Sequence, residues 1–232
     1  MNFSNRMKQE PFQAEHNTSF DYSDFWDRSW KAEDEESLSN WLESWHSSTS
    51  TEIELFKSYG VKTVCDAACG FGAHTIMFAS NGFDVSAFDV SPKAVELTIK
   101  GLRKYGFKGD KIKISDILNT SYVDESFDAV TAYAVLDHLT QKDAQSALNE
   151  LLRITKSGGL LLMSFDTAEE ADYRYSHELY SDGSMFYTDG TPYAGMIFCP
   201  YDKKKIEALT KGKKVVFQET NQKGNQIVIL QK

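Results

Sequence analysis

Short apolar segments alternate with amphipathic segments through the middle of the chain. The apolar segments predict strands over 62–67, 84–89, 111–115, 127–135 and 160–165. Helical spacing between them predicts helices over 73–78, 92–105 and 141–154. Strands and helices that alternate in this way are typical of a parallel sheet with helices on both faces. The pattern therefore predicts an α/β fold built on a doubly wound sheet.

The two ends of the chain have other patterns. Residues 1–19 are polar, and we expect them to be frayed. Leu38, Trp41, Leu42 and Trp45 form one apolar stripe at helical spacing, and 51–60 begins with a capping box and ends at glycine. The segments 214–220 and 226–231 flank the turn sequence NQKGN and predict a hairpin. The sheet is thus expected to be mostly parallel, with an antiparallel C-terminal hairpin strand.

These segments predict a single domain with four parts: a helical cap (1–60), a core (61–167), an insertion (168–200) and a C-terminal helix with the hairpin (201–232). The insertion is long for a loop that follows a strand, and long loops in compact domains are often lids or binding elements. We expect it to begin with a helical segment, to continue as a glycine-rich hairpin and to cover the substrate.

Composition excludes several function classes. The formal net charge is -9, which argues against a nucleic-acid partner, because such proteins normally carry a basic face. No run of about 18 apolar residues predicts a membrane span, and the first residues contain no apolar signal core. The odd count of three cysteines fits a reducing compartment, and Cys65 and Cys69 lack a second ligand pair. The sequence therefore predicts a cytoplasmic protein without a metal site, either monomer or homodimer.

A glycine turn follows the first predicted strand, in the stretch VCDAACGFGAHT at 64–75. A phosphate-binding P-loop would require a lysine after the glycines, and none follows. The dinucleotide fingerprint would require glycine or alanine where Thr75 stands. What remains is the pattern D-x-x-C-G-x-G, with Asp66 at the end of the strand.

This pattern resembles the first motif of the class I S-adenosylmethionine-dependent methyltransferases, a Rossmann-like family, and most closely its members that act on small molecules. The resemblance extends from Thr63 to Thr167, just under half of the chain. It implies S-adenosylmethionine as the cofactor, which makes 61–167 the cofactor-binding core and 168–200 a substrate lid. The cofactor-binding residues implied are Asp66, Ala68, Gly70, Gly72, Asp89, Val90, Asp116, Ile117, Tyr133 and Ala134.

The resemblance gives each of these residues a role. Asp66 would orient the methionine end, and the turn at 68–72 would bring backbone close to the cofactor. Asp89 would accept from the two ribose hydroxyls while Val90 packs on adenine. Asp116 would accept from the adenine amino group beside the backbone N–H of Ile117, and Tyr133 and Ala134 would line the methionine portion. Ala68 departs from the family, since many members have glycine there. A methyl group is tolerated there if φ is negative, so the departure bears only on how the backbone carbonyl meets the methionine amino group.

The implied reaction is in-line transfer of the methyl group to a small-molecule acceptor. The motif of amino-directed nucleic-acid methyltransferases is missing after the fourth strand, where AYAVLDHL stands. His138 is a candidate general base, although local packing explains it equally well, and Asp137 is expected to be solvated. Tyr22, Trp26 and Trp30 form a stretch able to fold over the cofactor. Arg28 in the same stretch could bind the methionine carboxylate, but we expect a surface salt bridge. A protein or RNA acceptor, and a non-catalytic cofactor-binding regulator, stay open as alternatives.

Overall fold

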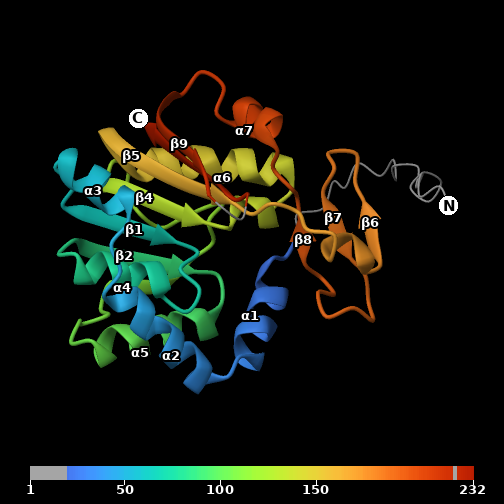
Figure 1. Cartoon of the computed structure of the whole chain (residues 1–232), viewed down its shortest axis with the longest axis horizontal. Coiled ribbons are helices and arrows are strands. Elements are labelled where there is room, and N and C mark those ends of the chain that lie inside the picture. Colours follow the sequence, from blue (N-terminus) through green and yellow to red (C-terminus); the bar gives the residue numbers. More distant parts are fainter. Residues whose placement is uncertain (1–19, 222–223) are drawn as a thin grey trace.

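A seven-stranded sheet forms the centre of the structure, a computed structural model that describes residues 20–221 and 224–232 (Figure 1). Its strand order is β3-β2-β1-β4-β5-β10-β9. The parallel strands are β1 (Thr63–Ala67), β2 (Asp84–Asp89), β3 (Ile112–Ile114), β4 (Phe127–Tyr133) and β5 (Thr155–Phe165), and the antiparallel ones are β9 (Lys214–Thr220) and β10 (Gln226–Gln231). The predicted α/β class and the antiparallel hairpin are both confirmed. The predicted fraying of residues 1–19 lies outside the described residues.

The order of the strands reverses beside β1. This strand pairs in parallel with β2 on one side and with β4 on the other, so that Val64 lies between Val85 and Ala129. Connections leave such a pair of strands in opposite directions, which opens a crevice at their carboxyl ends. The sequence between β1 and the next helix is the glycine turn.

Helices cover both faces of the sheet. They are α1 (Ser23–Ala32), α2 (Glu35–His46), α3 (Thr51–Ser58), α4 (Ala73–Ser80), α5 (Pro92–Lys104), α6 (Gln141–Ile154) and α7 (Lys203–Leu209). Alternate residues of β5 point to opposite faces. Leu161 packs with residues of α6 and α7, whereas Leu160 and Leu162 pack with residues of α3 and α4. None of the helices in the described residues is long and apolar enough to cross a bilayer.

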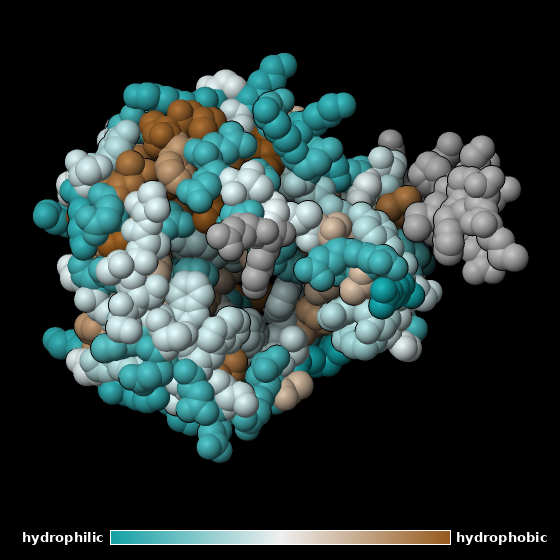
Figure 2. Space-filling view, in the orientation of Figure 1, coloured by the Kyte–Doolittle hydropathy of each residue, from teal (hydrophilic) through white to brown (hydrophobic). Residues whose placement is uncertain are grey.

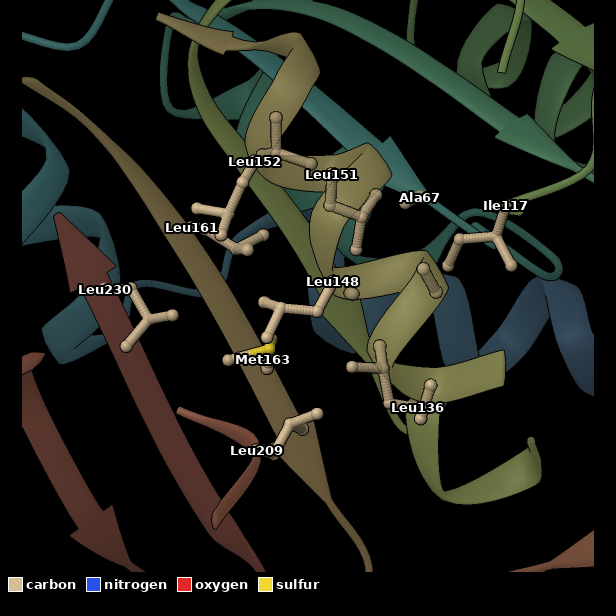
Figure 3. Close-up of a cluster of buried hydrophobic side chains, with 14 of the residues drawn as sticks. Ala67, Ile117, Leu136, Leu148, Leu151, Leu152, Leu161, Met163, Leu209 and Leu230 are labelled. Atoms are coloured by element: carbon tan, nitrogen blue, oxygen red, sulfur yellow. The ribbon is translucent and has the colours of Figure 1, made fainter. Parts of the chain in front are cut away.

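Leucines from α6 fill the core on one face of the sheet. Figure 3 shows Leu148 and Leu151 of α6 pointing toward Leu161 and Met163 of β5, all four without solvent exposure. The predicted helix over 141–154 has these bounds in the structure, with Thr140 accepting from the backbone N–H of Asp143 at its start. This packing fixes the loop between β4 and α6 at the carboxyl edge of the sheet.

Two segments differ from their predictions. β5 begins at residue 155 instead of 160, because the chain passes directly from α6 into the sheet and Thr155 pairs with Phe127. The insertion begins with a 3-10 turn, Asp172–Arg174, at the predicted helical start, but more than a hairpin follows. It continues as a three-stranded antiparallel sheet of β6 (His177–Leu179), β7 (Met185–Tyr187) and β8 (Ile197–Phe198).

The last two strands leave apolar side chains partly uncovered. Figure 2 shows apolar side chains gathered on the upper left of this face, where β9 and β10 lie in Figure 1. Val215 of β9 is exposed, and Phe217 and Ile227 are only partly buried against the core. Since β9 is the last strand in the order, the sheet ends at this edge.

Candidate functional site

A cavity of about 360 Å³ lies at the carboxyl ends of β1, β2 and β4. Its wall is formed by the glycine turn, by the residues that follow β2, β3 and β4, and by residues 20–45 of the N-terminal helices. The predicted site residues that line it are Asp66, Ala68, Gly70, Asp89, Val90, Asp116, Ile117, Tyr133, Ala134 and His138. The crevice at the reversal of strand order is therefore the place where these residues meet, as an open α/β sheet requires.

Asp66 lies at the bottom of this cavity and is almost completely buried. Its two carboxylate oxygens accept from the hydroxyl of Thr75 in α4, at 2.6 Å, and from the hydroxyl of Thr131 in β4, at 2.9 Å. Burial raises the pKa of Asp66 to about 6, while the two threonine hydrogen bonds oppose this shift. The carboxylate thus links three elements and still contributes to the cavity wall.

Asp89 closes β2 and holds the glycine turn in place. One of its oxygens accepts from the backbone N–H of Gly70 and the other from that of Ser91, both at 2.9 Å. Burial raises the pKa of this carboxyl, and the backbone hydrogen bonds oppose the shift. A carboxylate has about four lone-pair positions, so Asp89 retains acceptor capacity toward the cavity, enough for a pair of neighbouring hydroxyls.

The residues after β3 form the outer end of the cavity. Asp116 is exposed, and one of its oxygens accepts from the backbone N–H of Leu118 at 2.8 Å. Ile117 is buried against the core, and Val90 is half-buried beside Asp89. The arrangement offers a flat apolar surface next to a carboxylate, which suits a base with an exocyclic amino group.

The two glycines of the turn differ in position, because Gly70 lines the cavity and Gly72 packs against α5. Gly70 has a φ of 55°, and a Cβ there would lie 2.8 Å from Cζ2 of Trp30. Gly72 has a φ of 91°, and a Cβ there would lie 2.9 Å from Oγ1 of Thr98 in α5. Gly72 is not among the residues that line the cavity. Its place in the structure is between the turn and α5, so it allows close packing and not close approach of a ligand.

Ala68 does not meet the condition of a negative φ under which a methyl group is tolerated without strain. Its φ is 54°, in the left-handed region where a side chain is strained. Ala134, at the end of β4, has a φ of 47° and donates its N–H to the hydroxyl of Ser164 at 2.9 Å. Both alanines line the cavity, and strained backbone is often found where a chain must present particular groups to a ligand.

Helix α1 covers the cavity. Trp26 and Trp30 contribute to the wall, and the helix is fastened at two places. Tyr22 donates to Asp143 near the start of α6 at 2.6 Å. Asp27 accepts from the hydroxyl of Ser91 at 2.8 Å, at the start of α5. These hydrogen bonds hold α1 across the carboxyl edge of the sheet, as the sequence led us to expect for this stretch.

Arg28 lies on the outer side of α1. It forms an ion pair with Asp24 at 3.0 Å and donates to the carbonyl of Ala194 in the insertion at 3.0 Å. The predicted surface salt bridge is therefore confirmed, and Arg28 is not among the residues that line the cavity.

The insertion does not occupy the position that we expected. The residues that line the cavity include none from 168–200. In Figure 1 the strands β6 to β8 lie beside α1, on the side away from the large sheet. The cover over the cavity therefore comes from the N-terminal helices within the described chain, and the insertion supports that cover from behind. Its role in choosing a substrate stays a prediction.

His138 stands in a 3-10 turn after β4, between α1 and the insertion. Its Nδ1 lies 3.2 Å from the carbonyl oxygen of Ile197, and its ring meets that of Trp26 edge-on at 4.9 Å. A carbonyl oxygen can only accept, so in the neutral ring Nδ1 carries the proton and Nε2 has the free lone pair. The ring lines the cavity, so Nε2 is suited to act as a base.

Asp137 corrects another expectation, because it is completely buried and not solvated. Oδ2 accepts from the backbone N–H of Asp166 at 2.8 Å, whereas Oδ1 has no hydrogen-bond partner among the described residues. Burial raises the pKa of this carboxyl to about 6. The insertion also contacts the backbone of the 3-10 turn Leu136–His138, because the N–H of Cys199 donates to the carbonyl of Asp137.

Sequence reasoning missed His74. This residue lines the cavity from the first turn of α4, and its ring stacks on Tyr133 at 3.6 Å with an interplanar angle of 2°. Trp45 meets it edge-on at 4.6 Å. Burial lowers the pKa of His74 to about 3, so the ring is neutral at physiological pH. Its position directly after the glycine motif is the only sequence signal that could have identified it.

Comparison with known proteins agrees with the resemblance to methyltransferases that the core sequence showed. The methyltransferase domain family matches residues 64–159. Glycine/sarcosine N-methyltransferase of Aphanothece halophytica is 31% identical over 154 residues, which are 61% of this chain and 57% of that protein. The tRNA (carboxymethyluridine(34)-5-O)-methyltransferase of Arabidopsis thaliana is 31% identical over 114 residues, 47% of this chain and 25% of that protein. The chain thus covers less than two thirds of either relative.

A solved structure supports the fold. A SAM-dependent methyltransferase from Methanosarcina mazei superposes with a TM-score of 0.62 and 20% sequence identity. The match covers 79% of this chain and 98% of that one. At this level of identity the likeness establishes the fold alone.

Replacing Ala68 by glycine should stabilise the protein. Glycine adopts a positive φ without the clash that a Cβ causes, so we expect Ala68→Gly to raise the free energy of unfolding by about 1 kcal/mol. Urea unfolding followed by circular dichroism measures this change. Ala67→Gly is the matched control, because Ala67 lies in regular strand and should lose stability. A loss of stability in Ala68→Gly comparable to that in the control would contradict the strain.

The buried carboxyl of Asp137 should make stability depend on pH. Folding raises its pKa from 3.8 to about 6, so the folded protein binds this proton more tightly than the unfolded chain. The contribution to stability is thus present below pH 4 and lost as the pH rises to about 6, at most about 3 kcal/mol. Asp137→Asn should lack this loss when urea unfolding is measured from pH 4 to pH 7. Asp110→Asn, at an exposed turn, should keep the wild-type profile; parallel profiles for wild type and Asp137→Asn would rule the assignment out.

Proposed function

Because the chain belongs to the class I S-adenosylmethionine-dependent methyltransferase superfamily, we propose that it transfers the methyl group of S-adenosylmethionine to a small-molecule acceptor. One observation carries the proposal. Asp66 and Asp89, at the ends of neighbouring strands, line one cavity together with the side-chain-free Gly70. This is the arrangement that a ligand with a diol at one end and a cationic group at the other requires.

The residues present fit the cofactor. Asp89 has acceptor capacity for the ribose hydroxyls, and its two backbone hydrogen bonds fix the direction of the carboxylate. Asp116, Ile117 and Val90 would hold the adenine ring, and Asp66 would attract the methionine ammonium. When bound, the cofactor supplies a methyl group already activated by a sulfonium. The chain therefore needs mainly to position the acceptor and to exclude water.

The residues after β4 would act on the acceptor. Tyr133 and Ala134 line the cavity between the cofactor residues and His138. In the neutral ring of His138, Nε2 carries a lone pair that is not used toward Ile197. This nitrogen would accept the proton that the acceptor loses on methylation. Trp26 and Trp30 would keep water from the reacting atoms. The transfer itself is an in-line displacement, in which the nucleophile approaches opposite to the departing sulfur.

The covered cavity favours a small acceptor over a macromolecule. Helix α1 is fastened across the opening at Tyr22 and Asp27, which leaves little room for a folded RNA or protein to reach the site. The net charge of -9 gives no general attraction for RNA. The two curated relatives are named for glycine/sarcosine and for tRNA, so a protein or RNA acceptor is the second candidate. A non-catalytic cofactor-binding regulator is the third.

Asp89 should contribute more to cofactor binding than Asp116. We expect Asp89→Ala to lose two hydrogen bonds to a charged acceptor, each worth about 1.5–3 kcal/mol, and Asp116→Ala to lose one. Titration calorimetry with S-adenosylmethionine and S-adenosylhomocysteine measures both, with NAD and ATP as negative controls. Circular dichroism checks that Asp89→Ala still folds. Equal or reversed losses would contradict the assigned positions, and preferred binding of NAD would contradict the cofactor.

Methyl transfer should depend on His138. With a panel of metabolites as acceptors, we expect formation of S-adenosylhomocysteine, and His138→Gln should reduce kcat about 10²-fold or more while cofactor affinity stays unchanged. Total RNA and a protein extract are the comparison acceptors. If only RNA or protein accepts methyl groups, the small-molecule proposal is wrong, and an absence of transfer to any acceptor would favour the regulator.

A further inference from the structure

The part of the cavity beyond Ala134 has a wall of aromatic rings. The cofactor carboxylates Asp89 and Asp116 follow β2 and β3, whereas β4 lies on the other side of β1 in the sheet. The residues next to the end of β4 therefore form the acceptor end. We define the acceptor end as Phe20, Tyr22, Trp26, Tyr133, His138 and Leu139.

Among the described residues, no lysine or arginine balances the carboxylates of this cavity. Four aspartates line it, namely Asp21, Asp66, Asp89 and Asp116. The two basic side chains of α1 pair with acidic residues of the same helix. Arg28 pairs with Asp24 at 3.0 Å, and Lys31 pairs with Asp27 at 2.5 Å. An anionic acceptor would therefore find no lysine or arginine as a counter-ion in the described part of this wall.

Asp21 is exposed and brings a negative charge to the solvent-facing rim of the acceptor end. It stands directly between Phe20 and Tyr22, and Oδ1 accepts from both the hydroxyl and the backbone N–H of Ser23. These hydrogen bonds lower the pKa of the carboxyl, the hydroxyl bond contributing most. The side chain is thus ionised at neutral pH, next to rings whose faces also attract positive charge.

We propose that the methyl acceptor is an uncharged or positively charged molecule with a flat apolar body and without a carboxylate or phosphate. The inference rests on the proposed function, because it assigns the acceptor to the same cavity. A carboxylate or phosphate placed there would lose its hydration next to other carboxylates, which is costly without a paired cation. A cationic or neutral ring instead gains contact with the aromatic wall.

A cationic acceptor is compatible with transfer. An ammonium group gives one proton to Nε2 of His138, and the nitrogen lone pair that this frees forms the new N–C bond. The S–C bond breaks at the same time, with its electron pair staying on sulfur. The positive charge thus passes from the sulfonium to the methylated ammonium, and the proton leaves from His138 to solvent. A neutral hydroxyl acceptor balances in the same way, with its own proton passing to His138.

Intrinsic fluorescence reports directly on this cavity, because all four tryptophans of the chain line it. We suggest titrating the full chain, with S-adenosylhomocysteine at saturation, with three probes of similar shape: 2-phenylethylamine, 2-phenylethanol and phenylacetate. The expected result at pH 7 is that the amine and the alcohol bind at least about tenfold more tightly than phenylacetate. Equal or tighter binding of phenylacetate, or no binding of any probe, would overturn the inference.

Variants separate the rings from the charge. Trp26→Leu should weaken the amine about three- to tenfold and Asp21→Asn about threefold, whereas the alcohol should be insensitive to Asp21→Asn. Trp41→Leu is the matched control, because Trp41 stacks on Phe71 outside the acceptor end. Amine affinity unchanged in both Trp26→Leu and Asp21→Asn would refute the assignment. Failure of S-adenosylhomocysteine to bind in calorimetry would instead refute the proposed function, so the two failures are distinguishable.

Discussion

The buried carboxylate of Asp66 is the interaction on which the site depends. Its hydrogen bonds to Thr75 and Thr131 join β1 to the first turn of α4 and to β4. Burying a carboxylate costs free energy unless its oxygens accept hydrogen bonds, and those of Asp66 do so only where the three elements meet in this arrangement. This arrangement fixes the glycine turn between β1 and α4. In that turn the backbone N–H of Gly70 donates to the second carboxylate, Asp89. The cavity is the space that these constraints leave at the carboxyl edge of the sheet.

Most of the central sheet was predictable from local patterns. The alternation of apolar and amphipathic segments identified β1 to β5 and the helices between them, and α6 has its predicted bounds because its apolar stripe and its cap agree. The glycine motif located the cavity because glycines directly after a strand allow the backbone to come close to a ligand. Strand β5 was predicted too short, because residues 155–159 have no apolar pattern. They are held by the pairing of Thr155 with Phe127 and by backbone hydrogen bonds of Gly158 and Gly159 with Lys232.

The remaining features depend on contacts between distant residues. Tyr22 and Asp143, which hold α1, are 121 positions apart, and Asp27 and Ser91 are 64 apart. Nothing in a local window indicates such pairs. Asp137 is a polar residue in a short turn, which usually means exposure, yet the insertion packs over it. The sequence likewise could not reveal the φ of Ala68, because the backbone there follows from the packing of the whole turn.

The way in which α1 is held has a consequence for exchange with solvent. The helix is fastened by a few side-chain hydrogen bonds, each worth about 0.5–1.5 kcal/mol, whereas the sheet below it is held by whole ladders of backbone bonds. Release of α1 breaks these hydrogen bonds and exposes the buried side chain of Phe25, but it breaks no strand pairing, so it costs less than global unfolding. Entry and departure of ligands then take place by local opening of one helix. We expect the amide hydrogens of α1 to exchange before those of β1 and β4, and the rate of that opening to limit turnover.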